Sequence, residues 1–297
     1  MPRTSLRLAL CACVPLAAAA ALAADAVKLR PLVAIYVYGE SSGLKDPQGV
    51  ACSTGELVVA DSGRGRILAF TVSTDAVRPK SEFQIQQIPY PIRVGLLSNG
   101  NVLALDGKSR RIGRVTSSGS FEGWLEPKVD GPFAPRSFAV GDGDAVSVLD
   151  VAGWRVLTLD LGGEVKRSVG LPKDGRFFSD VAVDGRGGLY VVDSVGRRVY
   201  VARAADKEFT PVGEALTEDV DFPTALAVDD EGRVFVADEN GNGLVILDNN
   251  GTFRGRQLQT GWKDGFLRYP AGICLDGQGS LFIAERGNQR VQMFSVR

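Results

Sequence analysis

Acidic residues recur along this chain at a near-constant spacing, and an arginine follows most of them five residues later. The acids are Asp61, Asp106, Asp150, Asp193, Asp238 and Glu285. The arginines are Arg66, Arg111, Arg155, Arg198 and Arg290, with Gly243 at the fifth place. Such a set could bind a charged partner, but a feature found in nearly every repeat favours a structural role. At a tight turn the acid accepts backbone N–H groups, and the arginine on the returning strand reaches it.

Several kinds of catalysis are excluded by composition. The chain contains no histidine, which removes the usual zinc site, histidine general-base catalysis and any Ser-His-Asp triad. Glycine-rich turns such as Gly185–Gly188 match no phosphate-binding loop that precedes a helix. The sequence therefore indicates no catalytic constellation and no resident cofactor or metal, and we expect a protein that is not an enzyme.

The elements that position the acids are short strands. Each acid ends an apolar run such as LVVA before Asp61 or VFVA before Asp238, and turns rich in Gly, Asp and Asn follow. The acids are 45, 44, 43, 45 and 47 residues apart, a period typical of propeller blades. A proline opens the first strand of most repeats. The residues at this place are Pro47, Pro91, Pro135, Phe178, Pro223 and Pro270.

The repeats resemble the NHL-repeat family of β-propellers. The first, fifth and sixth copies match the repeat pattern of this family most fully. The pattern consists of a proline, a glycine, an apolar strand, a D-x-x-G turn, a second apolar strand that ends in V-A-D, and a following arginine. The resemblance runs from about residue 31 to the C-terminus. It implies an all-β fold of four-stranded antiparallel blades, but it does not define a function, because one scaffold hosts many.

The two ends of the repeat region predict a closed ring of six blades. The sixth copy stops at Arg297, directly after its third strand. The segment Leu32–Tyr38, LVAIYVY, is a strand without a repeat of its own. We expect it to complete blade six, since joining the first and last segments removes open sheet edges.

The N-terminal residues 1–23 read as a bacterial secretory signal peptide, with cleavage after Ala23, and residues 24–297 as one propeller domain. Arg3 and Arg7 precede the apolar run Leu8–Leu22, as in exported proteins. This predicts a periplasmic or secreted protein. A lipoprotein alternative would use Cys13, but the apolar run before it is short. No later segment is long and apolar enough to span a membrane.

Charge argues against nucleic acid as a partner. After removal of the leader, 32 basic and 35 acidic residues remain, whereas non-specific nucleic-acid binding requires a positive field.

Two cysteines remain in the mature chain, Cys52 and Cys274. They lie five and four residues after their prolines, on the first strands of blades that meet across the closure. Because side chains alternate faces along a strand, this opposite parity would allow the two to face each other. Two alternatives stay open, a disulfide in an oxidising compartment or two buried free thiols.

Binding residues are expected where the repeats disagree, at the second position after the proline and in the turns on the same face. This face would form the mouth of the central channel. The candidates are Arg93, Arg136, Asp180, Lys108, Trp154, Asn240 and Arg286.

We interpret the chain as a monomeric, non-enzymatic scaffold that binds an exported protein or an envelope polymer through this face. Two alternatives remain. One is a calcium-dependent lactonase or hydrolase, as in the gluconolactonase group that the repeats resemble, with Asp180, Asp193 and Asn240 as the nearest equivalents of its ligands. The other is a glycan-binding module that uses Trp154 and Trp262.

Overall fold

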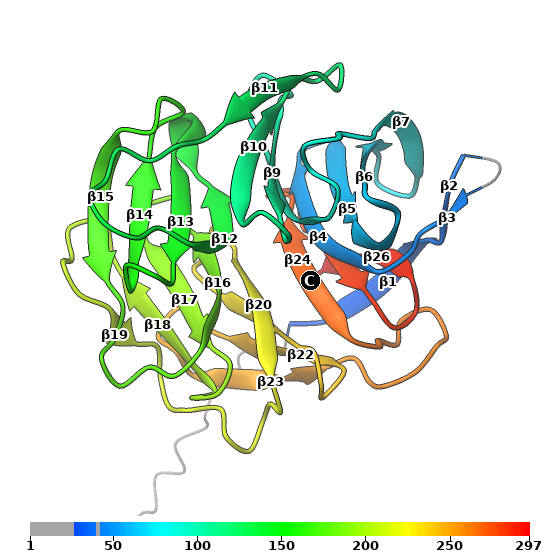
Figure 1. The fold of residues 1–297 in the computed structure, drawn as a ribbon. Helices are drawn as coiled ribbons and strands as arrows, with labels where there is room; N and C mark the ends of the chain where they lie inside the picture. The colour runs from blue at the N-terminus through cyan, green and yellow to red at the C-terminus, as the bar shows by residue number, and fades with distance from the viewer. Residues whose placement is uncertain (1–26, 40–41) are drawn as a thin grey trace, which may run out of the picture.

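A computed structural model describes residues 27–39 and 42–297. The predicted signal peptide, residues 1–23, lies outside the described residues. Six four-stranded antiparallel sheets stand around a central axis as the blades of a propeller (Figure 1). The prediction of an all-β, six-bladed ring is confirmed. Among the described residues, no helix combines the length and the apolar character that a membrane span requires.

Each of the first five blades consists of four consecutive strands, with the first strand nearest the axis. Blade one contains β4 (Pro47–Ser53), β5 (Glu56–Asp61), β6 (Arg66–Val72) and β7 (Val77–Phe83). Blade two contains β8 (Pro91–Leu96), β9 (Val102–Asp106), β10 (Arg111–Val115) and β11 (Phe121–Trp124). Blade three contains β12 (Pro135–Val140), β13 (Val146–Asp150), β14 (Arg155–Leu159) and β15 (Val165–Gly170).

The remaining blades follow the same plan. Blade four contains β16 (Phe178–Val183), β17 (Leu189–Asp193), β18 (Arg198–Ala202) and β19 (Thr210–Pro211). Blade five contains β20 (Pro223–Val228), β21 (Val234–Asp238), β22 (Gly243–Leu247) and β23 (Phe253–Gln257). Blade six contains β24 (Pro270–Leu275), β25 (Ser280–Glu285), β26 (Arg290–Val296) and the N-terminal β1 (Leu29–Ile35).

The second strands are apolar on both faces because each is covered by a neighbouring blade on either side. Every residue of β9, β13 and β21 is buried. The core is therefore a series of layers between blades. One layer joins Val58 and Ile67 of blade one to Val94 and Ala104 of blade two.

The N-terminal strand closes the ring, but its bounds differ from the expected Leu32–Tyr38. β1 pairs antiparallel with β26, from Leu29 opposite Val296 to Ile35 opposite Val291 (Figure 1). The expected segment is divided between two ladders, because Val37 and Tyr38 form β2, which pairs with β3 (Ser42–Gly43). The backbone turns away at Tyr36, whose carbonyl oxygen accepts the N–H of Leu44 at 2.8 Å.

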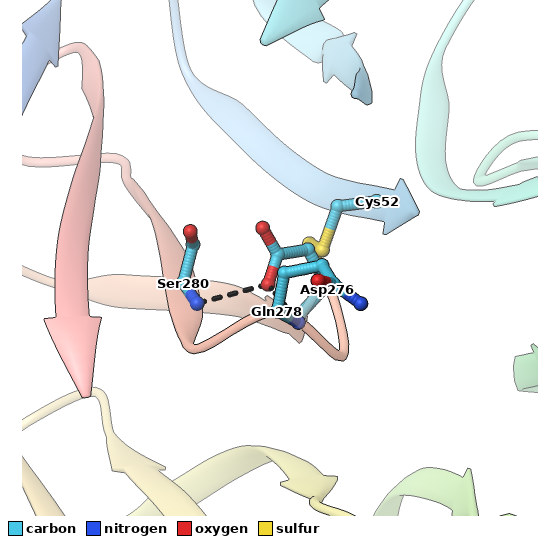
Figure 2. The surroundings of a disulfide bond; sticks show 5 residues. Cys52, Asp276, Gln278 and Ser280 are labelled. Atoms are coloured by element: carbon cyan, nitrogen blue, oxygen red, sulfur yellow. Dashed lines mark hydrogen bonds between the residues drawn. A yellow bond between two sulfur atoms is a disulfide. The ribbon is translucent and has the colours of Figure 1, made fainter. Parts of the chain in front are cut away.

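A disulfide joins Cys52 of β4 to Cys274 of β24, so the disulfide alternative is the one that the structure contains. The two Cα atoms are 6.0 Å apart, within the range that a disulfide spans. Figure 2 shows the bond beside the turn of Asp276–Ser280 at the end of β24. The ring is thus closed twice, by the β1–β26 ladder and by a covalent bond between the inner strands of blades one and six.

We expect the closing strand to stabilise the fold through its buried side chain. Ile35 is 7% exposed and packs in the layer between blades six and one, whereas Leu32 on the same strand is 37% exposed. Ile35→Ala should lower the free energy of unfolding by about 2–4 kcal/mol, and Leu32→Ala by less than about 0.5 kcal/mol. Urea unfolding of both variants checks this. Equal losses would contradict closure by β1.

We expect the disulfide to stabilise the ring without being required for folding. A bond across 222 residues restricts the unfolded chain by on the order of 5 kcal/mol in the chain-entropy model. Reduction, or Cys274→Ala, should therefore lower Tm while the β1–β26 ladder still closes the ring. Reductant should not change Tm of the Cys274→Ala variant further. Two thiols labelled in unfolded, non-reduced protein of residues 24–297 would contradict the bond.

Candidate functional site

The repeated acids hold the chain that enters each blade. A side-chain oxygen of each aspartate accepts the backbone N–H of the residue sixteen positions earlier, at 2.7–3.0 Å. The donors are Lys45, Tyr90, Ala134, Phe177 and Phe222. Glu285 accepts the N–H of Arg268, seventeen positions earlier, at 2.9 Å. All six carboxyl groups are buried, so these bonds satisfy groups that would otherwise be costly to bury.

The arginine partners are less regular than the sequence predicts. Ion pairs join Asp61 to Arg66 at 2.6 Å, Asp150 to Arg155 at 3.0 Å and Glu285 to Arg290 at 2.5 Å. In the fifth copy, where Gly243 stands, Asp238 is paired at 2.9 Å with Arg256 of the outer strand.

Two of the expected pairs are absent from the described residues. Arg111 points outward and pairs with Glu126, and its guanidinium lies 4.4 Å from the centre of the Trp124 ring. Asp193 and Arg198 form no ion pair in the part of the chain that the structure describes. Instead, Asp193 accepts four backbone N–H groups, those of Arg176, Phe177, Val195 and Gly196, which satisfy the carboxylate without an arginine.

Arg290 has the most partners of these arginines. Its side chain is fully buried, and besides Glu285 it donates to Tyr36, Asp264 and the backbone oxygens of the loop before β24. Burial disfavours its charge, but Glu285 and Tyr36 raise the pKa of Arg290 above its ordinary value. This residue therefore ties together blade six, the closing strand and the loop that leads into β24.

A β-bulge at the start of every first strand forms the channel mouth. In each blade the residue at the proline position pairs opposite the acid, and the ladder then skips one residue. A bulge leaves the extra residue unpaired and re-aims its side chain. The six bulged residues all line one cavity of about 360 Å³. They are Gln48, Ile92, Arg136, Ser179, Thr224 and Ala271.

The second position after the proline varies most between the repeats, and it lies deeper in the channel than the bulged residue before it. Asp180 is 7% exposed. Its carboxylate accepts the hydroxyl of Ser137, accepts the N–H of Leu226 at 3.1 Å and faces Arg93 at 3.5 Å. Asp180 therefore joins the inner strands of blades two to five inside the channel and is not part of an open rim.

The glycines at this position reflect close packing between first strands. A Cβ at Gly49 would lie 2.8 Å from the Cα of Arg93, and one at Gly272 would lie 2.4 Å from the carbonyl oxygen of Gln48. These glycines are therefore explained by steric constraint and not by binding.

On one side of the mouth, charges neutralise each other. Arg286 pairs with Asp46 at 2.7 Å and with Glu239 at 3.0 Å. Tyr90 donates its hydroxyl to Asp46 at 3.0 Å and accepts the amide of Gln48 at 2.7 Å. Burial opposes the charge of Arg286, but Asp46 and Glu239 raise its pKa above the ordinary value.

On the other side, two arginines line the cavity without an acidic partner among the described residues. Arg136 lies over the ring of Phe177, 4.2 Å from its centre, and its buried Nε has no hydrogen-bond partner. Burial and then the charge of Arg110 lower the pKa of Arg136 below its ordinary value. Arg110 occupies the turn between β9 and β10 with φ of 55°. The first repeat places Gly65 at the same turn position, so the left-handed backbone at this position suits glycine better than arginine.

The structure brings Arg93, Arg136 and Arg286 together around the mouth, but not the other candidates. Lys108, Trp154 and Asn240 do not line the cavity. Trp154 packs edge-on against Phe178 and donates its indole N–H to the oxygen of Pro172 at 3.3 Å. Trp262 is 73% exposed in the loop before β24.

Several residues that line the mouth were not predicted from the sequence. These are Tyr90, Phe177, Phe222 and Glu239. The first three directly precede the residue at the proline position, and the carboxylate hydrogen bonds described above fix their backbone. This regular place in the repeat is the signal that could have identified them.

Two of the three expected calcium ligands, Asp180 and Asp193, are held in separate hydrogen-bond groups. Asp180 is bound inside the channel, and Asp193 is bound by backbone at the entry to blade four. Among the described residues, no three side chains of His, Cys, Asp and Glu are grouped so that they could hold a metal ion.

A larger cavity, of about 700 Å³, lies on the opposite face between blades four and five. Four of its side chains are acidic, and Arg186, Arg203 and Tyr190 also line it. Burial, assisted by Asp184, raises the pKa of Tyr190 to about 12. The acids are engaged locally, as in the pair of Asp229 and Arg233 at 2.6 Å.

Comparison with known proteins supports the repeat assignment. The family model of the NHL repeat matches residues 267–294. Mouse (Mus musculus) NHL repeat-containing protein 3 is 32% identical over 77 residues, which cover 25% of this chain and 22% of that protein. The chain thus matches about a fifth of that relative's length.

Similar solved structures include two enzymes. Virginiamycin B lyase of Staphylococcus aureus is 14% identical with a TM-score of 0.63, over 91% of this chain and 99% of that chain. A gluconolactonase of Xanthomonas campestris is 16% identical with a TM-score of 0.65, over 94% and 93%. At such identities the likeness concerns the fold alone.

We expect the buried pair of Glu285 and Arg290 to be far more important for stability than the exposed pair of Arg111 and Glu126. Arg290→Met leaves a buried carboxylate without its cation and should cost about 3–5 kcal/mol of unfolding free energy. Arg111→Met, the matched control, should cost no more than about 1 kcal/mol. Denaturant unfolding at neutral pH measures both. Similar losses in the two variants would show that Arg290 is not a structural centre.

Proposed function

We propose that this six-bladed β-propeller, whose residues 267–294 match the NHL repeat, is a non-enzymatic scaffold that binds another exported protein or an envelope polymer at its channel mouth. The observation that carries this proposal is the ring of bulged residues. The bulge is the same in all six blades, whereas the side chain on it differs in each. A fixed backbone that presents varied side chains is the arrangement expected of a recognition surface on a rigid support.

The mouth needs no large movement to bind. The backbone that leads into each bulge is hydrogen-bonded to a buried carboxylate, and the inner strands are linked below by Asp180 and by the disulfide. A partner would meet a preformed cavity with charged, aromatic and hydroxyl groups at its wall. Such preorganised surfaces change little on binding.

The residues available support a scaffold over the enzymes that share the fold. A virginiamycin B lyase variant described as catalytically inactive carries a histidine-to-alanine change, and this chain contains no histidine. The carboxylate of Asp193 is already saturated by four N–H groups. Of the two tryptophans of the glycan-binding alternative, Trp154 is 38% exposed but its ring packs on Phe178 and its N–H is bonded to Pro172, whereas Trp262 is 73% exposed.

Export is part of the proposal. The signal-peptide pattern of residues 1–23 supports it, and the disulfide between Cys52 and Cys274 is compatible with an oxidising compartment outside the cytosol. The partner would then be encountered in the periplasm or outside the cell.

Blocking the mouth should abolish partner binding. Thr224→Trp and Ile92→Trp each place a large ring in the cavity, and Gln278→Trp makes the same change at an exposed turn on the opposite face. Cross-linking in envelope extract, followed by affinity measurement with the purified partner, should show binding by the native protein and by Gln278→Trp only. Variants with unchanged Tm that still bind the partner would contradict the proposal.

A calcium titration tests the main alternative in the same preparation. A scaffold of the kind proposed should show no change in Tm between calcium and chelator. Stoichiometric calcium with a rise of several degrees would instead favour the hydrolase interpretation and overturn the non-enzymatic proposal.

A further inference from the structure

We propose that Arg110 and Arg136 form a carboxylate-binding site for an acidic peptide segment at the channel mouth. This inference rests on the proposed function and names the chemistry that the mouth would recognise. A carboxylate placed between the two guanidinium groups would supply the acceptor that each lacks among the described residues. The neighbouring Phe177 and Phe222 would contact an apolar side chain next to the acid.

The distribution of charge is the first step of the argument. Four arginines line the mouth cavity. Arg93 faces Asp180, and Arg286 is held between Asp46 and Glu239. Arg110 and Arg136 line the same cavity without an acidic partner among the described residues, and burial, followed by the charge of Arg110, lowers the pKa of Arg136. An anion bound between them would compensate both charges and form charge-assisted hydrogen bonds, which are the stronger kind.

The second step is the fixed position of Arg136. The side chain stands on a bulge and lies over the Phe177 ring at 4.2 Å, so the guanidinium is supported on one face by an aromatic ring. Its Nε is buried without a partner. A preorganised guanidinium with unused donors is suited to a planar carboxylate, which it can bind through two parallel hydrogen bonds.

The third step is the choice of a peptide over other anions. Phe177 and Phe222 lie side by side with ring centres 6.1 Å apart, and Ile92 lines the same cavity. These apolar walls would have no role in binding a small inorganic anion, whereas a peptide offers apolar and acidic side chains next to each other. A cavity of about 360 Å³ accommodates one or two side chains. Two uncompensated charges in a chain with more acids than bases are too few for a nucleic acid, which needs an extended positive surface.

The left-handed backbone at Arg110 allows a substitution that removes the charge without straining the turn. Because the equivalent turn position carries Gly65, Arg110→Gly removes the charge and suits the left-handed φ of 55°. Arg136→Met keeps an apolar contact with Phe177 while removing the buried donor. The matched control is Arg197→Gly, at the same turn position of blade four with φ of 49°. The Arg197 side chain binds the oxygen of Thr217 and does not line the mouth.

The experiment compares two pools of short fluorescein-labelled peptides by fluorescence anisotropy. One pool has Asp or Glu in the centre and Leu, Val or Phe beside it, and the other has Asn or Gln in the same place. The native protein and Arg197→Gly should bind the acidic pool at least about tenfold more tightly, and added salt should reduce this preference. The double variant Arg110→Gly with Arg136→Met, at unchanged or higher Tm, should bind both pools alike.

Equal binding of the two pools by the native protein, or an acidic preference that survives in the double variant, would overturn the inference. Oligogalacturonate serves as a second carboxylate source. If it binds through the two arginines and the acidic peptides do not, the peptide assignment is wrong. If instead the mouth-blocking variants lose the partner while the peptide pools bind alike, the scaffold proposal stands and only the acidic-peptide inference fails.

Discussion

The structure depends on one repeated interaction, the buried carboxylate that accepts backbone N–H groups at the entry to each blade. The carboxyl group ends the second strand, and its acceptor sites are filled by residues sixteen or seventeen positions earlier. Breaking one such contact would leave a buried charge without its donors, which is costly. The contact therefore fixes where the first strand starts, places the bulge after the proline position and directs the bulged residue towards the axis.

The need for this contact distinguishes the features that build every blade from the side chains that vary between blades. The acid, the bulge and the left-handed turn residue recur in every blade, because each is required to build the same hairpin. The arginine after the acid varies from blade to blade. Arg66 and Arg290 are buried ion-pair partners of their acids, Arg111 pairs with Glu126 on the outside, and Asp193 accepts four backbone N–H groups with no arginine partner among the described residues.

The sequence was sufficient for those features that follow directly from strand periodicity. The period of the acids predicted six blades, and the opposite parity of Cys52 and Cys274 predicted that the two side chains could face each other, as they do in the disulfide. Deviations arose where a bulge or a break interrupts the alternation of side chains. The extra residue at each proline shifts the mouth from the second position to the first, so Asp180 is buried and Thr224 lines the cavity. Likewise, LVAIYVY reads as one strand, but its backbone turns at Tyr36 to join a second ladder.

The backbone of the mouth is the same in every blade, but the charges of its side chains are compensated on one side and not on the other. Around Arg286, acids from two blades compensate the cation, and the hydroxyl of Tyr90 adds a hydrogen bond to Asp46. Around Arg136, the neighbouring groups are aromatic or cationic. A solvated surface arginine would readily rotate towards water, but one stacked on a ring with its Nε buried cannot do so without losing that contact. The bulge thus holds the Arg136 guanidinium in a place where its charge adds little to the stability of the fold. Such a local conflict between stability and side-chain choice is expected at functional sites.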